Sequence, residues 1–291
     1  MLVASPDRIA PVMPDIRLCP EREERIPVEG GHIYVRINGD LDNGRPPTVM
    51  VHGGPGSAHW YFLNATALAD ERAVILYDQL DSGRSDNPND PANWRVERFV
   101  DELDAIRAHL GIERWHVLGT SWGGTVVLEY GARQPEALAG LILQSPLVST
   151  ASWLADANRL KDAMPADIRA ILHRGDTPDA PSDEDCTRAT EAFYRRHVQL
   201  ADPPQEIAAY RAALPRSFNA GIYNHMWGRA EFTASGRSNI MTAWPCSTAS
   251  TAPAPCSSPA KRTKPPPKPW PNSPGARVRN SQSCPTLRIS Q

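Results

Sequence analysis

Residues 116–127 constrain the fold of this chain more than any other segment. A short apolar run at 115–118 leads at once into the pattern Gly-x-Ser-x-Gly at 119–123, and a helix-like apolar pattern follows. A serine at such a strand-to-helix corner sits in a strained turn, with its hydroxyl held clear of the sheet. Only small residues fit two positions before and after it, because strand and helix nearly touch there. Ser121 is therefore the candidate nucleophile, and the alternative is a glycine-rich turn that happens to contain a serine.

A second informative stretch is the loop His-Gly-Gly-Pro-Gly at residues 52–56, which follows a continuous apolar run at 48–51. Glycines allow the backbone to approach a ligand closely, and the N–H groups of the loop have no helix to satisfy them. Such a loop suits an oxyanion hole, in which one donor comes from the loop and the other from the residue after the nucleophile. Those residues are Gly54 and Trp122. A plain tight turn is the alternative.

The chain alternates strand-like and helix-like segments. Two β-like runs at 24–28 and 32–37, separated by Glu-Gly-Gly, predict a hairpin, and an apolar run at 73–77 predicts a buried strand. Apolar residues at three- and four-residue spacing over 96–110 predict an amphipathic helix, and 138–143 predicts a further strand. This order indicates a mostly parallel sheet with helices on both faces. Ligands of such sheets bind at the carboxyl ends of the strands, where His52, Asp78 and Ser121 fall.

The bulk properties exclude several classes of function. With 291 residues, 41% hydrophobic content and a formal charge of −2, the chain can form one large α/β domain with an insertion and has no nucleic-acid footprint. It has neither a signal peptide pattern at its start nor an apolar run long enough to cross a membrane, so we expect a cytoplasmic protein. The five cysteines lack zinc-ligand spacing, so we expect no metal. The oligomeric state is not predicted.

Three ordered motifs together resemble a known family. These are Met-Val-His-Gly-Gly-Pro-Gly at 50–56 with the residues after it, Tyr-Asp-Gln-Leu-Asp-Ser-Gly-Arg-Ser-Asp at 77–86, and Gly-Thr-Ser-Trp-Gly-Gly at 119–124. The chain from about 21 to 236 resembles the proline iminopeptidase family of α/β-hydrolases, in particular its tricorn-interacting aminopeptidases and amino-acid amidases. One departure is Asp81, where the family usually has glycine, which implies a loop of altered shape.

The resemblance implies an α/β-hydrolase fold and a cofactor-free serine aminopeptidase or amidase. Such an enzyme releases an N-terminal residue, often proline, from a small peptide or amino-acid amide through an acyl-enzyme on serine. Ser121 would be the nucleophile, and Gly54 and Trp122 would supply the oxyanion N–H groups.

After residue 145 the sequence changes to helical segments with few strand signals, which indicates an inserted helical cap. We predict an α/β-hydrolase core at 1–145, the cap at 146–236 and a separate tail at 237–291. An aminopeptidase needs carboxylates to hold the substrate ammonium and apolar walls for its side chain. By resemblance, Glu231, after a Trp-Gly stretch, is the first candidate for the amine ligand, and Glu191 is the second; the alternative for each is a solvated charge.

The tail at 237–291 does not fit this scheme. A serine hydrolase of this order needs an Asp and then a His after the nucleophile, to orient and supply the base. The tail contains no Asp, Glu or His, is rich in proline and shows no apolar periodicity, so by composition we expect disorder. The C-terminal part of the fold is then missing. His52, His59 and His225 are conceivable substitute bases, but each has another role in its own motif.

A shifted reading frame explains this tail. When each residue is re-read from the last base of the preceding codon and the first two of its own, residues 256–273 permit V-L-L-T-G-E-A-D-E-A-T-P-E-T-V-A-E-F. That sequence resembles the family's strand and acidic loop with the catalytic Asp, which falls at Thr263. We therefore expect a frameshift between about 236 and 240 and little activity of the chain as given; a natural low-complexity tail is the alternative.

Two rival functions remain open. One is a general esterase or C–C hydrolase on the same fold, which would not need an amine ligand. The other is a non-catalytic protein that binds aminoacyl ligands through the cap.

Overall fold

The computed structural model describes residues 15–133, 135–174 and 181–235, all within one compact unit. The predicted tail at 237–291, with its expected disorder and frameshift, lies outside the described residues. The domain boundaries at 145 and 236 stay predictions.

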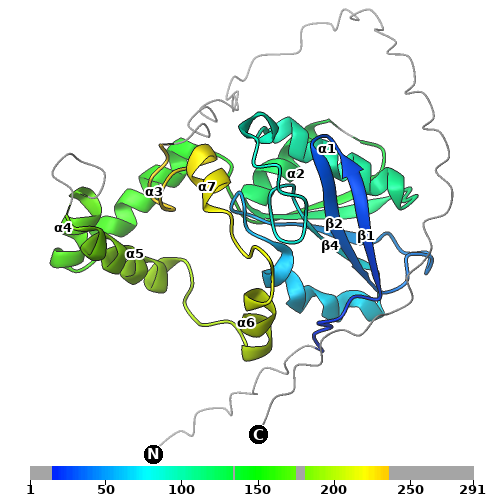
Figure 1. The fold of residues 1–291 in the computed structure, drawn as a ribbon, viewed down its shortest axis with the longest axis horizontal. Coiled ribbons are helices and arrows are strands. Elements are labelled where there is room, and N and C mark those ends of the chain that lie inside the picture. Colours follow the sequence, from blue (N-terminus) through cyan, green and yellow to red (C-terminus); the bar gives the residue numbers. More distant parts are fainter. Residues whose placement is uncertain (1–14, 134, 175–180, 236–291) are drawn as a thin grey trace, which may run out of the picture. The chain divides into compact units, whose positions relative to one another are not determined.

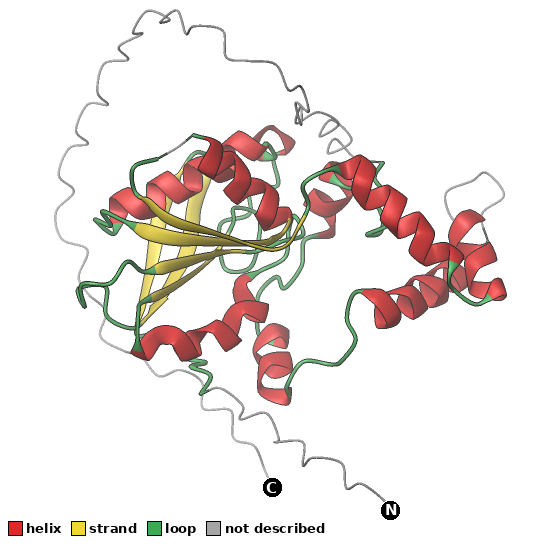
Figure 2. Cartoon of the chain, turned by 180° about the vertical axis from the view of Figure 1, so that it is seen from behind, coloured by secondary structure: helices red, strands yellow, loops and turns green. Residues whose placement is uncertain are grey.

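The described chain forms one sheet with the order β1-β2-β4-β3-β5-β6 (Figures 1 and 2). The strands β3 to β6 pair in parallel, whereas β2 pairs antiparallel with both β1 and β4. The predicted α/β-hydrolase fold, with a mostly parallel sheet, is confirmed. The strands are β1 (Arg22–Val28), β2 (Gly31–Asn38), β3 (Thr48–Val51), β4 (Val74–Asp78), β5 (Trp115–Ser121) and β6 (Leu138–Pro146).

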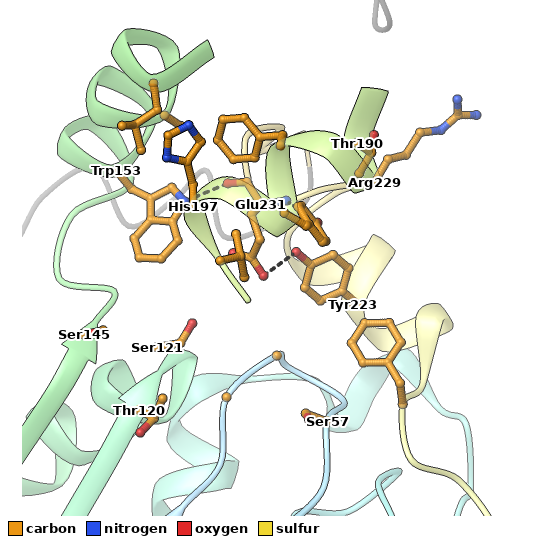
Figure 3. A pocket seen from close by; sticks show the side chains of 18 of the residues that line it. Ser57, Thr120, Ser121, Ser145, Trp153, Thr190, His197, Tyr223, Arg229 and Glu231 are labelled. Carbon is orange, nitrogen blue, oxygen red and sulfur yellow. Dashed lines mark hydrogen bonds between the residues drawn. The ribbon is translucent and has the colours of Figure 1, made fainter. Parts of the chain in front are cut away.

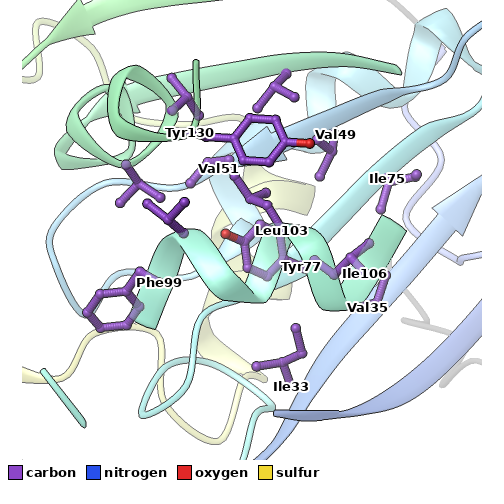
Figure 4. Packing of buried hydrophobic residues seen from close by; sticks show 14 of the residues in the cluster. Ile33, Val35, Val49, Val51, Ile75, Tyr77, Phe99, Leu103, Ile106 and Tyr130 are labelled. Atoms are coloured by element: carbon purple, nitrogen blue, oxygen red, sulfur yellow. The ribbon is translucent and has the colours of Figure 1, made fainter. Parts of the chain in front are cut away.

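Alternation along the central strands divides the core between the two faces of the sheet. Val49 and Val51 of β3 join the cluster formed with α1 (Val96–His109) and α2 (Trp122–Ala132), as Figure 4 shows. Met50, between them, joins a second cluster with Phe62 and Leu63 of the 3-10 helix η1 (His59–Asp70). Successive side chains of a strand point to opposite faces, so an apolar run here means a strand covered on both sides.

In the described part of the chain, five helices follow β6, in the region where a helical cap is predicted. They are α3 (Thr150–Asp162), α4 (Ala166–Arg174), α5 (Asp183–His197), α6 (Gln205–Ala212) and α7 (Ala220–Met226). Helices α3, α4 and α5 have a small apolar core of their own, in which Ala157, Leu172 and Phe193 pack with Phe232. No helix of the described residues is both long and apolar enough to cross a membrane.

The strand β6 differs from the other parallel strands because it lies at an edge of the described sheet. Its apolar run is of the kind that suits a strand buried on both faces, yet Ile142 and Leu143 are 45% and 40% exposed. An edge strand with exposed apolar residues is a predicted aggregation site.

Candidate active site

Ser121 occupies a strained corner between β5 and α2. Its φ of 53° and ψ of −120° lie in a region that non-glycine residues rarely adopt. The two flanking glycines allow the close approach of strand and helix. A Cβ on Gly119 would lie 2.3 Å from the carbonyl oxygen of Gly123, and a Cβ on Gly123 would lie 2.1 Å from that of Val51. The predicted strand, sharp turn and helix are all present.

The loop after β3 lies directly beside this corner. A Cβ built on Gly53 would lie 3.0 Å from Ser121 Cβ, and the Gly53 N–H donates to the hydroxyl of Tyr61. Trp122 is the first residue of α2, where backbone N–H groups have no partner within the helix. Its indole is buried and donates to Gln79 Oε1 at 3.3 Å. The roles of Gly54 and Trp122 as oxyanion donors stay predictions.

A cavity of about 1020 Å³ opens above Ser121 (Figure 3). It brings together three predicted site residues, Ser121, Gly54 and Glu231. The side chain of Trp122 is not among its lining residues, and neither is Glu191, which is exposed on α5. The walls are largely aromatic and apolar and are drawn mainly from the cap: Trp153, Leu160, Phe193, Tyr194, Val198, Phe218 and Tyr223.

Glu231 is held in the wall of this cavity through both its backbone and its side chain. The Trp153 indole donates to its carbonyl oxygen at 2.7 Å, and its own N–H donates to the Tyr194 hydroxyl at 3.0 Å. The Tyr223 hydroxyl donates to Glu231 Oε1 at 3.0 Å, as drawn in Figure 3. Burial raises the pKa of the carboxyl above its usual value, although the bond from Tyr223 opposes this. A cation that enters the cavity would favour the ionised form.

His52, the first residue of the loop, is engaged elsewhere. It is fully buried, its Nε2 accepts from Gln79 N at 2.9 Å, and its Nδ1 contacts Gly53 O at 3.0 Å. Burial lowers the pKa of His52 to about 4, despite the opposing effect of Asp78, so the ring is neutral near pH 7. Both ring nitrogens are occupied, so His52 cannot take a proton from Ser121.

The other histidines of the described residues form no hydrogen bond with Ser121. His59 Nδ1 contacts Asp78 Oδ1 at 2.8 Å and its Nε2 contacts the Tyr210 hydroxyl at 2.8 Å. His225 packs edge-on against Trp94 and does not line the cavity. Among the cavity residues the one histidine is His197, on α5. Within the described part of the chain, no hydrogen bond joins a histidine to Ser121, and no cluster of three metal-ligating side chains occurs.

Comparisons with known proteins identify the family of this chain. Residues 46–245 match the family model described as alpha/beta hydrolase fold. Proline iminopeptidases of Heyndrickxia coagulans and Lactobacillus helveticus (strain DPC 4571) are 37% and 35% identical to the chain, over 72% and 74% of it and 72% and 73% of their own length. The chain belongs to the proline iminopeptidase family of α/β-hydrolases.

Solved structures give the same result. The proline iminopeptidase of Mycobacterium smegmatis is 37% identical, with a TM-score of 0.64 and 74% of each chain covered. The structure of VinJ is 33% identical, with a TM-score of 0.67, and the match covers 78% of this chain and 76% of VinJ.

The structure gives a reason why aspartate can stand at position 81, where the family usually has glycine. Asp81 has a φ of 67°, a left-handed conformation that glycine adopts without strain. Its buried side chain is held by two donors, the Asn89 N–H at 2.7 Å and the Trp94 indole at 2.8 Å. Aspartate tolerates this conformation better than most residues because its short side chain bonds locally.

Sequence reasoning did not identify two residues that line the cavity, Tyr61 and His197. Part of the signal was present. Residues 190, 193, 194 and 197 recur at three- and four-residue spacing and form one face of α5. The spacing alone does not say whether such a face covers a core or a ligand.

Proposed function

We propose that the chain is built as a serine aminopeptidase or amidase that releases an N-terminal residue from a small peptide or amino-acid amide. The observation that carries the proposal is one cavity shared by Ser121, at its strained corner, and the partly buried carboxylate of Glu231. A nucleophile and an amine-binding carboxylate in one apolar cavity suit a substrate whose ammonium lies close to the carbonyl that is cleaved.

In the proposed reaction Ser121 Oγ attacks the scissile carbonyl and loses its proton to a base. The carbonyl oxygen gains negative charge, which the N–H groups of Gly54 and Trp122 would stabilise. The C–N bond then breaks, the amine leaves with a proton, and water hydrolyses the acyl-serine. No cofactor takes part in these steps.

The base is the missing part, so we propose that this chain has little activity. Among the described residues no histidine reaches Ser121, and the tail at 237–291 holds neither Asp nor His. Loss of the base leaves only the residual catalysis of an oxyanion hole and binding. A frameshift in the gene accounts for this loss; a nucleotide sequence across codons 230–260 tests it, and a tail found in frame would contradict it.

Serine labelling tests the nucleophile separately from turnover. A fluorophosphonate probe should modify Ser121 slowly, because the hydroxyl is accessible but not activated, and peptide mass spectrometry should locate the label there. The matched control is Ser57→Ala, which alters another serine of the cavity. Labelling that persists in Ser121→Ala and disappears in Ser57→Ala would contradict the assignment.

Amine binding tests Glu231. Isothermal titration with L-prolinamide or L-phenylalaninamide should show binding that Glu231→Gln weakens, whereas Glu191→Gln should have no effect because that side chain is exposed. Binding should also weaken as the pH falls through the raised pKa of Glu231, since protonation removes its charge. A preference for acyl esters without a free amine would favour the rival esterase, and amide binding without any fluorophosphonate labelling of Ser121 would favour the rival binding protein.

A further inference from the structure

The part of the cavity that lies between α3 and α5 has no role in the steps above. We call it the cap chamber and define it by its lining residues: Ala157, Leu160, Thr190, Phe193, His197 and Val198. In Figure 3, His197 is drawn farther from Ser121 than the Glu231 carboxyl group, and the Trp153 ring lies beside that group. A ligand group in the cap chamber would therefore be a part of the substrate remote from the reacting carbonyl.

Two helix faces line the cap chamber, and each of them includes a residue that bonds to the backbone of Glu231. On α3, Trp153, Ala157 and Leu160 share one face, and Trp153 binds the Glu231 carbonyl oxygen. On α5, Tyr194 binds the Glu231 N–H, and its neighbours on the same face continue the wall. If the ammonium of a substrate is held at Glu231, the side chain of the same substrate residue lies at the entrance of the chamber.

The cavity is larger than a prolyl group would fill. Pockets of roughly 300–1,000 Å³ bury ligands of drug size, and the whole cavity here has a volume of about 1020 Å³. A small N-terminal residue would leave the chamber walls without contact. A large apolar side chain would remove those walls from water, which strengthens binding in proportion to the area covered.

His197, which lines the chamber, also carries an unused polar atom. His197 Nε2 is buried and has no hydrogen-bond partner among the described residues. Its ring lies against Phe193, with 4.9 Å between the ring centroids. A buried polar atom without a partner weakens the folded state unless a ligand or water supplies the bond. An aromatic group with an N–H or O–H at its far edge fits both the apolar walls and this atom.

On the basis of the proposed function, we propose that the cap chamber holds the side chain of the substrate's N-terminal residue and selects a bulky aromatic one with a polar edge, such as an indole or a phenol. The ammonium of that residue pairs with Glu231, and the edge bonds to His197.

Titration calorimetry with five amides tests this selection on the intact chain. We expect L-tryptophanamide and L-tyrosinamide to bind at least about tenfold more tightly than L-prolinamide and glycinamide, since they cover more apolar surface. L-phenylalaninamide should bind a few-fold more weakly than the first two, because it lacks the polar edge. Equal affinity for prolinamide and tryptophanamide would overturn the proposal.

A pair of variants on α3 separates the chamber from the rest of the cavity. Ala157→Leu fills the chamber and should remove the preference for tryptophanamide while leaving prolinamide affinity unchanged. Ala155→Leu makes the same change at an exposed position of the helix and should change neither. His197→Phe should bring tyrosinamide to the affinity of phenylalaninamide. A tryptophanamide preference that survives Ala157→Leu would contradict the assignment, and so would a tyrosinamide advantage that survives His197→Phe.

The two proposals fail in different ways. If Glu231→Gln weakens every amide but no aromatic preference exists, only the cap chamber assignment is wrong. If aromatic amides bind equally well to Glu231→Gln and the original chain, the amine-binding role fails and with it the orientation argued above. Absence of binding for every amide would overturn both.

Discussion

Two sites in this molecule hold complementary halves of a catalytic group. At Ser121 a serine lies in a strained corner beside a cavity, and none of the described histidines reaches it. At His59 a histidine ring contacts the buried carboxylate of Asp78 at 2.8 Å, as a base would contact its orienting acid, but no nucleophile lies on its other side. That other nitrogen contacts Tyr210 instead. The comparison shows that, among the described residues, the residue types of a triad are present but are divided between two sites.

The His59–Asp78 pair holds the loop after β4 in place and takes no part in the proposed reaction. Asp78 Oδ1 also accepts from the backbone N–H of His59, and Asp78 Oδ2 accepts from that of Arg84 at 2.9 Å. Burial alone would raise the pKa of Asp78, but His59 and these donors bring it to about 2. The carboxylate therefore ties the start of η1 to the loop after β4.

The largest predicted effect is on stability at this pair. Asp78→Ala removes the acceptor of several buried donors and should lower the free energy of unfolding by about 3–5 kcal/mol. Ser121→Ala should change it by less than about 1 kcal/mol, because no hydrogen bond to that hydroxyl is made by the described residues. Urea denaturation of both variants measures the difference. Equal losses of unfolding free energy in the two variants would contradict the difference drawn between the two sites.

A second prediction concerns acid stability at His52. Its folded pKa of about 4 lies below the ordinary value of 6.5, so the unfolded chain binds the proton more readily. The contribution of the neutral His52 ring to the free energy of unfolding is therefore fully present above pH 6.5. It is lost as the pH falls toward 4, by roughly 3 kcal/mol in all. The difference in unfolding free energy between the original chain and His52→Asn should shrink over this window. A constant difference between pH 7 and 4 would contradict the buried, neutral ring.

A smaller effect is expected at the far side of the His59 ring. Tyr210→Phe removes the hydroxyl that contacts His59 Nε2 and should cost about 1–2 kcal/mol of unfolding free energy. It should not create serine-dependent hydrolysis, since His59 does not line the cavity. Leu200→Ala, at an exposed side chain, is the control. Hydrolysis gained by Tyr210→Phe would show that the two sites communicate.

The smallest predicted effect is a gain in stability. Ser121→Gly relieves a φ of 53° that glycine adopts freely, but glycine also adds freedom to the unfolded chain. We expect a net stabilisation of about 1 kcal/mol. Thermal unfolding of Ser121→Gly beside Ser121→Ala measures it, because alanine removes the hydroxyl without relieving the backbone. A glycine variant less stable than the alanine variant would contradict stored strain at the corner.

Local patterns predicted the corner and the fold well. Glycines two positions before and after Ser121 are required by the contact of strand with helix, and that requirement is visible in the sequence. The strand β3 and the helix α1 were likewise predicted, because their apolar patterns are regular. The 3-10 helix η1 was not predicted, although Phe62, Leu63, Thr66 and Ala69 recur at helical spacing.

What could not be predicted depends on contacts between distant segments. The exposure of β6 cannot be read from its own apolar sequence, although the expected loss of the C-terminal part of the fold does predict an exposed apolar edge of the sheet. Glu231 and Glu191 are equally charged in sequence, yet only the first is drawn into the cavity wall by Trp153 and Tyr194. His197 was overlooked as a cavity residue for the same reason.

The most direct measurement is the turnover of aminoacyl-arylamides by the purified chain beside Ser121→Ala. The account predicts that the two release arylamine at rates that differ little, with kcat at least about 10³-fold below the roughly 10 s⁻¹ typical of enzymes. Turnover near the typical rate that disappears in Ser121→Ala would contradict it, because a base would then have to reach Ser121.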